Sequence, residues 1–364
     1  MPKKQTGVAP LTTPVTKNNA SIGDERKPTA LGAVSNDPAK MITAALLYGG
    51  TSLLLVVSNK VCLTTYEFPD AVALALSQCC CTLAIIFLCS CAGVIKTNLS
   101  YTAFSRMFVL CLVNAANVGT GLIGTKHVSI PMFTALRRVS ILLTMIGEGI
   151  ILKKEVELET KFYVGLMCGG AFLGAIYDLS FNFFGYASIL TSALCTALSA
   201  VLTKVKLHDK TLTKWDILVY NNLVALPLYA FGIYARGSIP KLTSFKNFDS
   251  SGFLLYFWMS SFLGITLQFT ILYAVQVNGP LSLTITGLLK NVITAYLGFM
   301  GIGGDYIFAW PSFLGINISM IGGVLFSRAK YLKALKSKAK EPIVVAKDRK
   351  ESHKVEGKSS EQLV

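Results

Sequence analysis

Residues 129–152 read SIPMFTALRRVSILLTMIGEGIIL, an apolar stretch with two arginines in its interior. A helix needs about 20 predominantly apolar residues to cross about 30 Å of hydrocarbon, and this stretch is long enough. Each charge at the centre of such a helix costs about 2.5–3.5 kcal/mol even on the lenient insertion scale. The stretch therefore predicts a membrane-spanning helix in which Arg137 and Arg138 have a function that outweighs their cost.

The rest of the chain has the composition of a multi-pass membrane protein. Of its 364 residues 52% are hydrophobic and only 15% are charged, too few charges to cover a water-facing surface. Soluble globular proteins are therefore excluded. Ten stretches are long and apolar enough, or nearly so, to span a membrane: 41–59, 70–93, 106–126, 129–152, 160–179, 182–204, 216–235, 251–276, 280–300 and 306–327.

The nine cysteines do not predict a disulfide framework. Five of them lie in one apolar run with no histidine nearby, so we interpret them as small packing residues and expect neither a metal nor another cofactor. These five are Cys79, Cys80, Cys81, Cys89 and Cys91.

Two of the expected spans resemble each other. The fourth opens with Pro131 and reaches its arginines six residues later, and the ninth opens with Pro280 and reaches Lys290 ten residues later. The difference is four residues, about one helical turn. Spans five apart have opposite orientations, and inverted repeats with a site between them are a transporter architecture. We therefore expect an all-α membrane protein of ten transmembrane helices in two inverted five-helix repeats.

Lysine and arginine are concentrated in two polar tails. Residues 1–40 hold six of the 34, and residues 328–364 hold eleven. Basic segments beside membrane spans face the cytosol, and two such tails on one side require an even number of spans. We expect a disordered cytosolic tail over 1–40, a ten-helix transporter domain over 41–327 (halves about 41–179 and 182–327), and a basic cytosolic tail over 328–364. The expected partner of this charge is the lipid bilayer, and not a nucleic acid.

Three cations remain inside the expected spans, Arg137, Arg138 and Lys290. They could pair with buried carboxylates, but only Glu148 and Asp178 are candidates, so at least one cation is left over. We expect at least two of the three to face a water-filled cavity and bind an anion. Because a guanidinium fork binds two oxygens at once, phosphate is the preferred anion.

Polar side chains in other spans suggest what accompanies the phosphate. Tyr220, Asn221 and Asn222 fall within one helical turn and could either read a nucleobase or join helices by hydrogen bonds. No P-loop and no pairing of a nucleophile with a base is present, so we do not expect an enzyme. We assign contacts with the sugar or ribose to a third group: Thr284, Thr286, Gly287, Leu288, Asn291, Gln268 and Asn117.

At these residues the chain resembles nucleotide-sugar transporters of the drug/metabolite transporter superfamily. Residues 129–142 and 147–154, together with 287–291 and 303–308, are similar to the UDP-glucuronic acid/UDP-N-acetylgalactosamine and UDP-N-acetylglucosamine transporters. The resemblance implies the fold of ten helices in two inverted halves. It also implies exchange of a cytosolic nucleotide sugar for a luminal nucleoside monophosphate in the Golgi or endoplasmic reticulum membrane; the charge of the two tails places both termini in the cytosol.

One motif points to a different base. Tyr220-Asn221-Asn222 is similar to the base-recognition motif of GDP-mannose transporters, but the second motif of those proteins, Gly-Ala-Leu-Asn-Lys, is altered here at 287–291. We therefore expect UDP-sugars and UMP, with GDP-mannose and GMP as the alternative. A membrane-embedded enzyme and a non-transporting scaffold are the hypotheses from other classes, and a homodimer stays open. The last four residues, 361–364, carry no retention signal, which favours the Golgi.

Overall fold

The computed structural model describes residues 37–95, 97, 99–151, 156–206, 214–302 and 306–333, which belong to one compact unit. Throughout these ranges the regular structure is helical, and no strand occurs in them. The helices are α1 (Pro38–Lys60) with a π-helical extension (Val61–Thr65), α2 (Ala71–Cys91), α3 (Tyr101–His127), α4 (Ile130–Leu136), α5 (Val139–Ile151), α6 (Leu158–Ile176), α7 (Phe183–Lys206), α8 (Lys214–Ala235), α9 (Ile239–Thr243), a 3-10 turn (Lys246–Asp249), α10 (Ser251–Phe299) and a carboxyl-terminal helix (Trp310–Lys333).

The protein is an all-helical multi-pass membrane protein, as the composition predicts. Within the described ranges eight helices are long and apolar enough to cross a membrane. Two expected spans, 160–179 and 280–300, are not among the eight. The first corresponds to α6, and the second to the shorter apolar stretch Ile285–Phe299 within α10. The full set of ten spans in two inverted repeats therefore stays a prediction.

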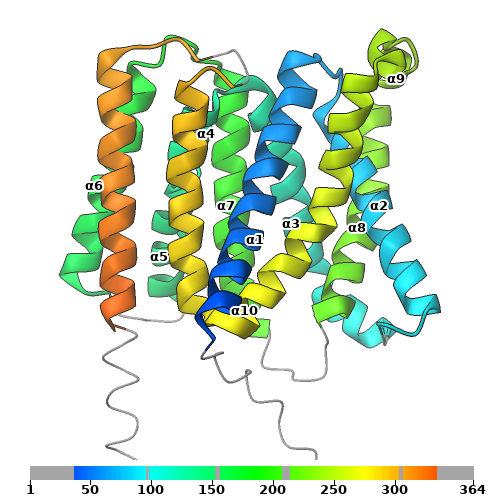
Figure 1. Ribbon diagram of the computed structural model, residues 1–364, viewed down its shortest axis with the longest axis horizontal. Helices are drawn as coiled ribbons and strands as arrows, with labels where there is room; N and C mark the ends of the chain where they lie inside the picture. Colours follow the sequence, from blue (N-terminus) through cyan, green and yellow to red (C-terminus); the bar gives the residue numbers. More distant parts are fainter. Residues whose placement is uncertain are drawn as a thin grey trace, which may run out of the picture. The chain divides into compact units, whose positions relative to one another are not determined.

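Helix α10 contains two of the expected spans in one element of 49 residues. Figure 1 shows it bent into a V whose two ends lie at the same end of the helix bundle. Its single proline, Pro280, follows Gly279 and divides it into 251–279 and 280–299. Proline lacks the N–H that would bond one turn back and its ring clashes with that turn, so a bend in this region is expected.

The span over 129–152 is interrupted at its two arginines. Helix α4 ends at Leu136, and α5 begins at Val139. Between them the backbone bonds tighten from four-residue to three-residue spacing, from the Arg138 amide to the Ala135 carbonyl (3.1 Å) and from Ser140 to Arg137 (3.2 Å). This short turn changes the direction in which the side chains at 137 and 138 leave the helix.

Close packing of α4 against the second part of α10 brings the cations of the two expected repeats together. A Cβ atom at Gly298 would lie 2.5 Å from the ring of Pro131, so only glycine permits this approach. From that contact Arg137 lies six residues along α4, about 9 Å, and Lys290 lies eight residues back along α10, about 12 Å. The two helices run in opposite directions, and both side chains therefore reach a similar depth in the bundle.

A second close contact joins α6 to the carboxyl-terminal helix, and it yields a test of the packing. A methyl group at Gly170 would overlap the backbone of Gly315 and Ser319, whereas at Gly169 it would meet no atom within 4 Å. Gly170→Ala should therefore destabilise the protein by about 1–3 kcal/mol, because the helices must separate. Thermal unfolding in detergent measures the effect, and Gly169→Ala is the matched control. Equal midpoints for the two variants would contradict this packing.

The two ends of the described chain lie at the same end of the bundle (Figure 1), as two cytosolic tails require. Asn19 and Asn98 head sequons but lie outside the described residues, and we expect both to face the cytosol and carry no glycan. Asp249→Thr, which completes a sequon at Asn247 near the opposite end, should add one. Endoglycosidase-sensitive gel shifts check all three sites. A glycan at Asn98 would show that the protein has the opposite orientation in the membrane.

Candidate functional site

A cavity of about 590 Å³ lies among α1, α2, α3, α4, α8 and both parts of α10. Its volume is in the range of about 300–1,000 Å³ that holds small organic ligands. Its wall mixes apolar side chains with amides, hydroxyls and two cations, and no aspartate or glutamate is among the described residues that line it. The cavity is therefore positively charged.

The two cations are Arg137 and Lys290. Arg137 is exposed on the cavity wall, and its guanidinium carbon lies 5.5 Å from the ring centre of Phe133. The Lys290 ammonium donates a hydrogen bond to Ser52 and lies 5.8 Å from the ring centre of Tyr48. Each cation thus has a neutral or aromatic neighbour in place of a carboxylate, and an anion between them would be attracted by both.

The third expected cation, Arg138, points away from this cavity. It is buried, donates to the Ser319 hydroxyl (3.2 Å) and packs against Gly323 on the carboxyl-terminal helix. Asp178, a candidate partner for such a charge, instead accepts hydrogen bonds from Tyr186 (2.5 Å) and Ser180 (2.7 Å). Arg138 therefore packs between helices, and of the two arginines only Arg137 lines the cavity.

Four asparagines from α3 and α8 form an amide wall, which we define as Asn114, Asn117, Asn221 and Asn222. The Asn114 amide donates to the Asn221 oxygen (3.2 Å). The Asn117 oxygen accepts from two hydroxyls on α7, and the Asn222 amide donates to a carbonyl one turn back on α8. These bonds fix the amides and leave both donor and acceptor atoms for a polar ligand.

Tyr220, expected beside these asparagines, is not in the cavity wall. It is buried with α3, where its hydroxyl bonds the backbone of Ser100 (2.8 Å to the amide) and its ring centre lies 5.8 Å from that of Phe104. Consecutive residues on a helix point about 100° apart, so only part of a three-residue cluster can face one cavity. Stacking of the Tyr220 ring on a base does not fit this position.

The residues assigned to the sugar are divided in the same way. Gln268 and Asn117 line the cavity, and Gln268 is exposed there. Gly287 and Thr286 instead approach α1, at Tyr48 and Gly49. Leu288 and Asn291 are half-buried and are not in the cavity wall, and the side chain of Thr284 lies outside the described part of the structure.

Sequence reasoning missed a polar cluster formed by Asn59, Gln78 and Ser260. The Gln78 amide nitrogen donates to the Asn59 oxygen (3.0 Å) and the Ser260 hydroxyl (2.8 Å), and the Ser260 hydroxyl also bonds the Asn59 oxygen (2.5 Å). Asn59 and Gln78 line the cavity, whereas Ser260 is fully buried behind them. Each amide is the only one in its helix, which is a feature that the sequence displays.

No family model matches the chain, but several curated proteins are similar to it. It is 36% identical over 289 residues to UDP-sugar transporter sqv-7 of Caenorhabditis elegans, covering 79% of this chain and 88% of that protein. It is 37% identical to UDP-sugar transporter UST74c of Drosophila melanogaster (79% and 77% covered) and 35% identical to the human nucleotide sugar transporter SLC35D2 (82% and 88%).

The chain belongs to the nucleotide-sugar transporters. These relatives are transporters and not enzymes, which agrees with the expectation from the sequence. No group of three or more metal-ligating side chains occurs among the described residues.

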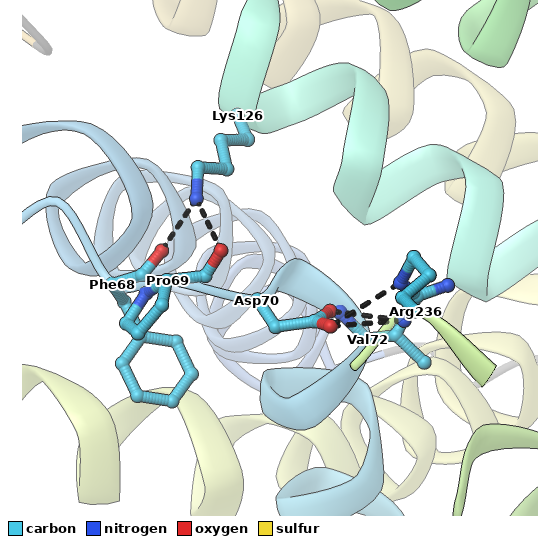
Figure 2. A network of polar contacts seen from close by, with 6 residues as sticks. All are labelled: Phe68, Pro69, Asp70, Val72, Lys126 and Arg236. Carbon is cyan, nitrogen blue, oxygen red and sulfur yellow. Dashed lines mark hydrogen bonds and ion pairs between the residues drawn. The ribbon is translucent and has the colours of Figure 1, made fainter. Parts of the chain in front are cut away.

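The transporter has a network of polar contacts, shown in Figure 2, at the end of the bundle opposite the termini. Asp70 caps α2 by accepting from the Val72 amide (2.8 Å), and Arg236 after α8 donates to both of its oxygens (3.0 and 3.1 Å). Lys126 at the end of α3 donates to the carbonyls of Phe68 and Pro69 (2.7 Å each). The Asp70–Arg236 pair joins the first half of the chain to the second.

A fully buried lysine, Lys60, lies next to the end of α3. The Lys60 ammonium donates to the carbonyls of Thr125 (2.9 Å) and Val128 (2.8 Å), so it ties the end of α1 to the end of α3. From the sequence Lys60 looks like a loop cation, because it precedes the connection to α2. The π-helical continuation of α1 is what places it inside the transporter.

The Asp70 carboxylate is charged at neutral and mildly acidic pH. Burial alone would raise the pKa of Asp70, but hydrogen bonds from Ser238, the Val72 amide and Arg236, with the Arg236 charge, hold it below the ordinary value. A lowered pKa means that the stabilisation is complete above the ordinary carboxyl pKa and is lost only as the pH falls through the lower, folded value. A slightly acidic compartment therefore leaves this contact intact.

Proposed function

We propose that the protein exchanges cytosolic UDP-sugars (UDP-glucuronic acid, UDP-N-acetylgalactosamine or UDP-N-acetylglucosamine) for luminal UMP across the Golgi membrane, with the endoplasmic reticulum as the alternative. The observation that carries this proposal is the pair of cations in a cavity whose described lining has no carboxylate. Two positive charges beside an amide wall suit an anionic, polar ligand of nucleotide size. The names of the relatives, two of which are UDP-sugar transporters, support uridine.

The phosphates are assigned to Arg137 and Lys290. The guanidinium binds two oxygens of one phosphate, and the ammonium serves as a compact charge for the next. Both UDP-sugar and UMP carry phosphate, so both can use the same cations, which is what an exchange requires.

The base is assigned to the amide wall. Uracil presents alternating acceptors and a donor along its edge, and the carboxamides of Asn221 and Asn114 offer both kinds of atom. The alternative ligand pair, GDP-mannose and GMP, is favoured by the Tyr220-Asn221-Asn222 motif. Because Tyr220 lies outside the cavity wall, the part of this motif that can contact a base is Asn221 and Asn222.

Transport by alternating access requires contacts between the two halves of the chain to open and close, and Figure 2 shows one of them, the Asp70–Arg236 pair. The Asp70–Arg236 pair and the bond from Asn247 to the Tyr66 carbonyl (3.1 Å) both join the two halves of the chain. We assign them to the gate on the luminal side, so the conformation described is the one closed toward the lumen.

Lys290→Ala tests the phosphate assignment. Loss of a charge-assisted contact, about 1.5–3 kcal/mol, should weaken binding of UMP and UDP-sugar alike by at least about tenfold. Competition binding to purified protein measures both affinities, and Lys330→Ala, which removes an exposed cation from the carboxyl-terminal helix, is the control. Unchanged affinity and exchange in Lys290→Ala would remove Lys290 from the ligand site. If the wild-type protein binds GMP and not UMP, the base of the transported nucleotide is guanine and not uracil.

Asp70→Asn tests the gate. Weakening a partly exposed ion pair costs up to about 1 kcal/mol, so the luminal side should open roughly fivefold more often. Deuterium uptake at the backbone of 66–72 should rise accordingly, because asparagine can still cap α2 and only the charge is lost, and Arg236→Gln, which keeps the Asp70 cap, should raise the uptake as well. Protection that does not change in Asp70→Asn would show that this ion pair does not hold the gate.

A further inference from the structure

The cluster of Asn59, Gln78 and Ser260 has unused hydrogen-bonding capacity that faces the cavity. The Asn59 oxygen already accepts from two groups, and the Gln78 nitrogen already donates to two. Two atoms remain, the Asn59 amide nitrogen and the Gln78 carbonyl oxygen. Neither has a hydrogen-bond partner within the described ranges, and both belong to residues of the cavity wall.

The cluster is rigid because each member comes from a different helix. Asn59 is on α1, Gln78 on α2 and Ser260 on α10, and Asn59 is only 8% exposed. The shared bonds couple the two amides: if Gln78 alone were flipped, its oxygen would face the Asn59 oxygen, and if both were flipped, one nitrogen and one oxygen would still be turned outward. A donor and an acceptor are thus held in fixed positions before any ligand arrives.

We propose that Asn59 and Gln78 bind the hydroxyl-rich sugar of the nucleotide sugar and so determine which sugar is carried, with Ser260 as a positioning residue. This inference rests on the proposed function. A sugar hydroxyl donates and accepts at once, which matches one free nitrogen and one free oxygen. A phosphate has only acceptor oxygens at neutral pH and would be repelled by the Gln78 oxygen.

A uracil edge also presents donors and acceptors, so base and sugar share this chemistry. The amide wall offers separate groups for the base, and the two sources differ in a measurable way. UMP contains the base and a phosphate but no sugar beyond its ribose. A residue that contacts the transferred sugar should therefore affect UDP-sugar and spare UMP, whereas a residue that contacts the base should affect both.

The test is the Gln78→Met substitution in the full-length protein, with affinities for UMP and for three UDP-sugars measured by competition. Methionine keeps the length of the side chain and removes its polar end. We expect the affinity for the preferred UDP-sugar to fall at least tenfold, the affinity for UMP to stay within twofold, and the differences among UDP-glucuronic acid, UDP-N-acetylgalactosamine and UDP-N-acetylglucosamine to shrink.

Ser77→Ala is the matched control. Ser77 and Ser261 share a hydrogen bond (3.0 Å) between the same two helices, one residue away from the cluster, and neither lines the cavity. This variant should lose one hydrogen bond between α2 and α10 and keep the wild-type preference among the UDP-sugars. If Ser77→Ala changes the preferences as Gln78→Met does, the effect is structural and the proposal fails.

The remaining outcomes are decisive as well. Equal loss of UMP and UDP-sugar affinity in Gln78→Met assigns the cluster to the base or to the fold, and unchanged affinities remove it from the site. Asn59→Ser, which deletes the free nitrogen, decides the question in the same way if Gln78→Met does not insert. If the wild-type protein binds neither UMP nor any UDP-sugar, the proposed function itself is contradicted. If the wild-type protein binds UMP and UDP-sugars but the variant keeps the wild-type sugar preference, only the role of the cluster is contradicted.

Discussion

The rest of the structure depends on holding two positive charges inside a membrane protein, in a cavity whose described lining has no carboxylate. Arg137 and Lys290 line one cavity. Burial of such charges is costly in a low-dielectric interior, and they are tolerated where a water-filled space keeps them hydrated. The cavity is thus a condition for these side chains to exist in the membrane, and the same charges attract anions.

The helices around the cavity show how that space is kept open. The bend of α10 and the break between α4 and α5 place cations from distant parts of the sequence at similar depth, and the contact of Gly298 with Pro131 fixes the distance between their helices. Polar side chains near the cations bond one another across helix boundaries, as Asn117 does with α7. Because these groups are satisfied from behind, their free atoms can be presented to a ligand without first losing other bonds.

Much of this arrangement follows from the sequence, because a charge in an apolar span is a strong indication. Counting cations selected Arg137, Arg138 and Lys290, and two of them line the cavity. Which arginine faces inward could not be predicted, because this depends on the rotation of α4 and on the tight turn that follows it. For the same reason the helical turn from Tyr220 to Asn222 contributes two residues to the wall and not three. Lys60 and Gln78 were missed because their roles come from a π-helical extension and from contacts among three helices.

The charge of the cavity also bears on why the proposed reaction would be an exchange. During alternating access the cavity must pass through a state closed on both sides, with little room for water. An empty cavity would then enclose two cations with no counter-charge, and their repulsion and loss of hydration would raise the barrier. A bound phosphate replaces the lost water with negative charge, and it does so equally well on UDP-sugar and on UMP. On this argument the loaded protein changes conformation readily in both directions and the empty protein does so slowly, which couples the inward movement of one nucleotide to the outward movement of the other.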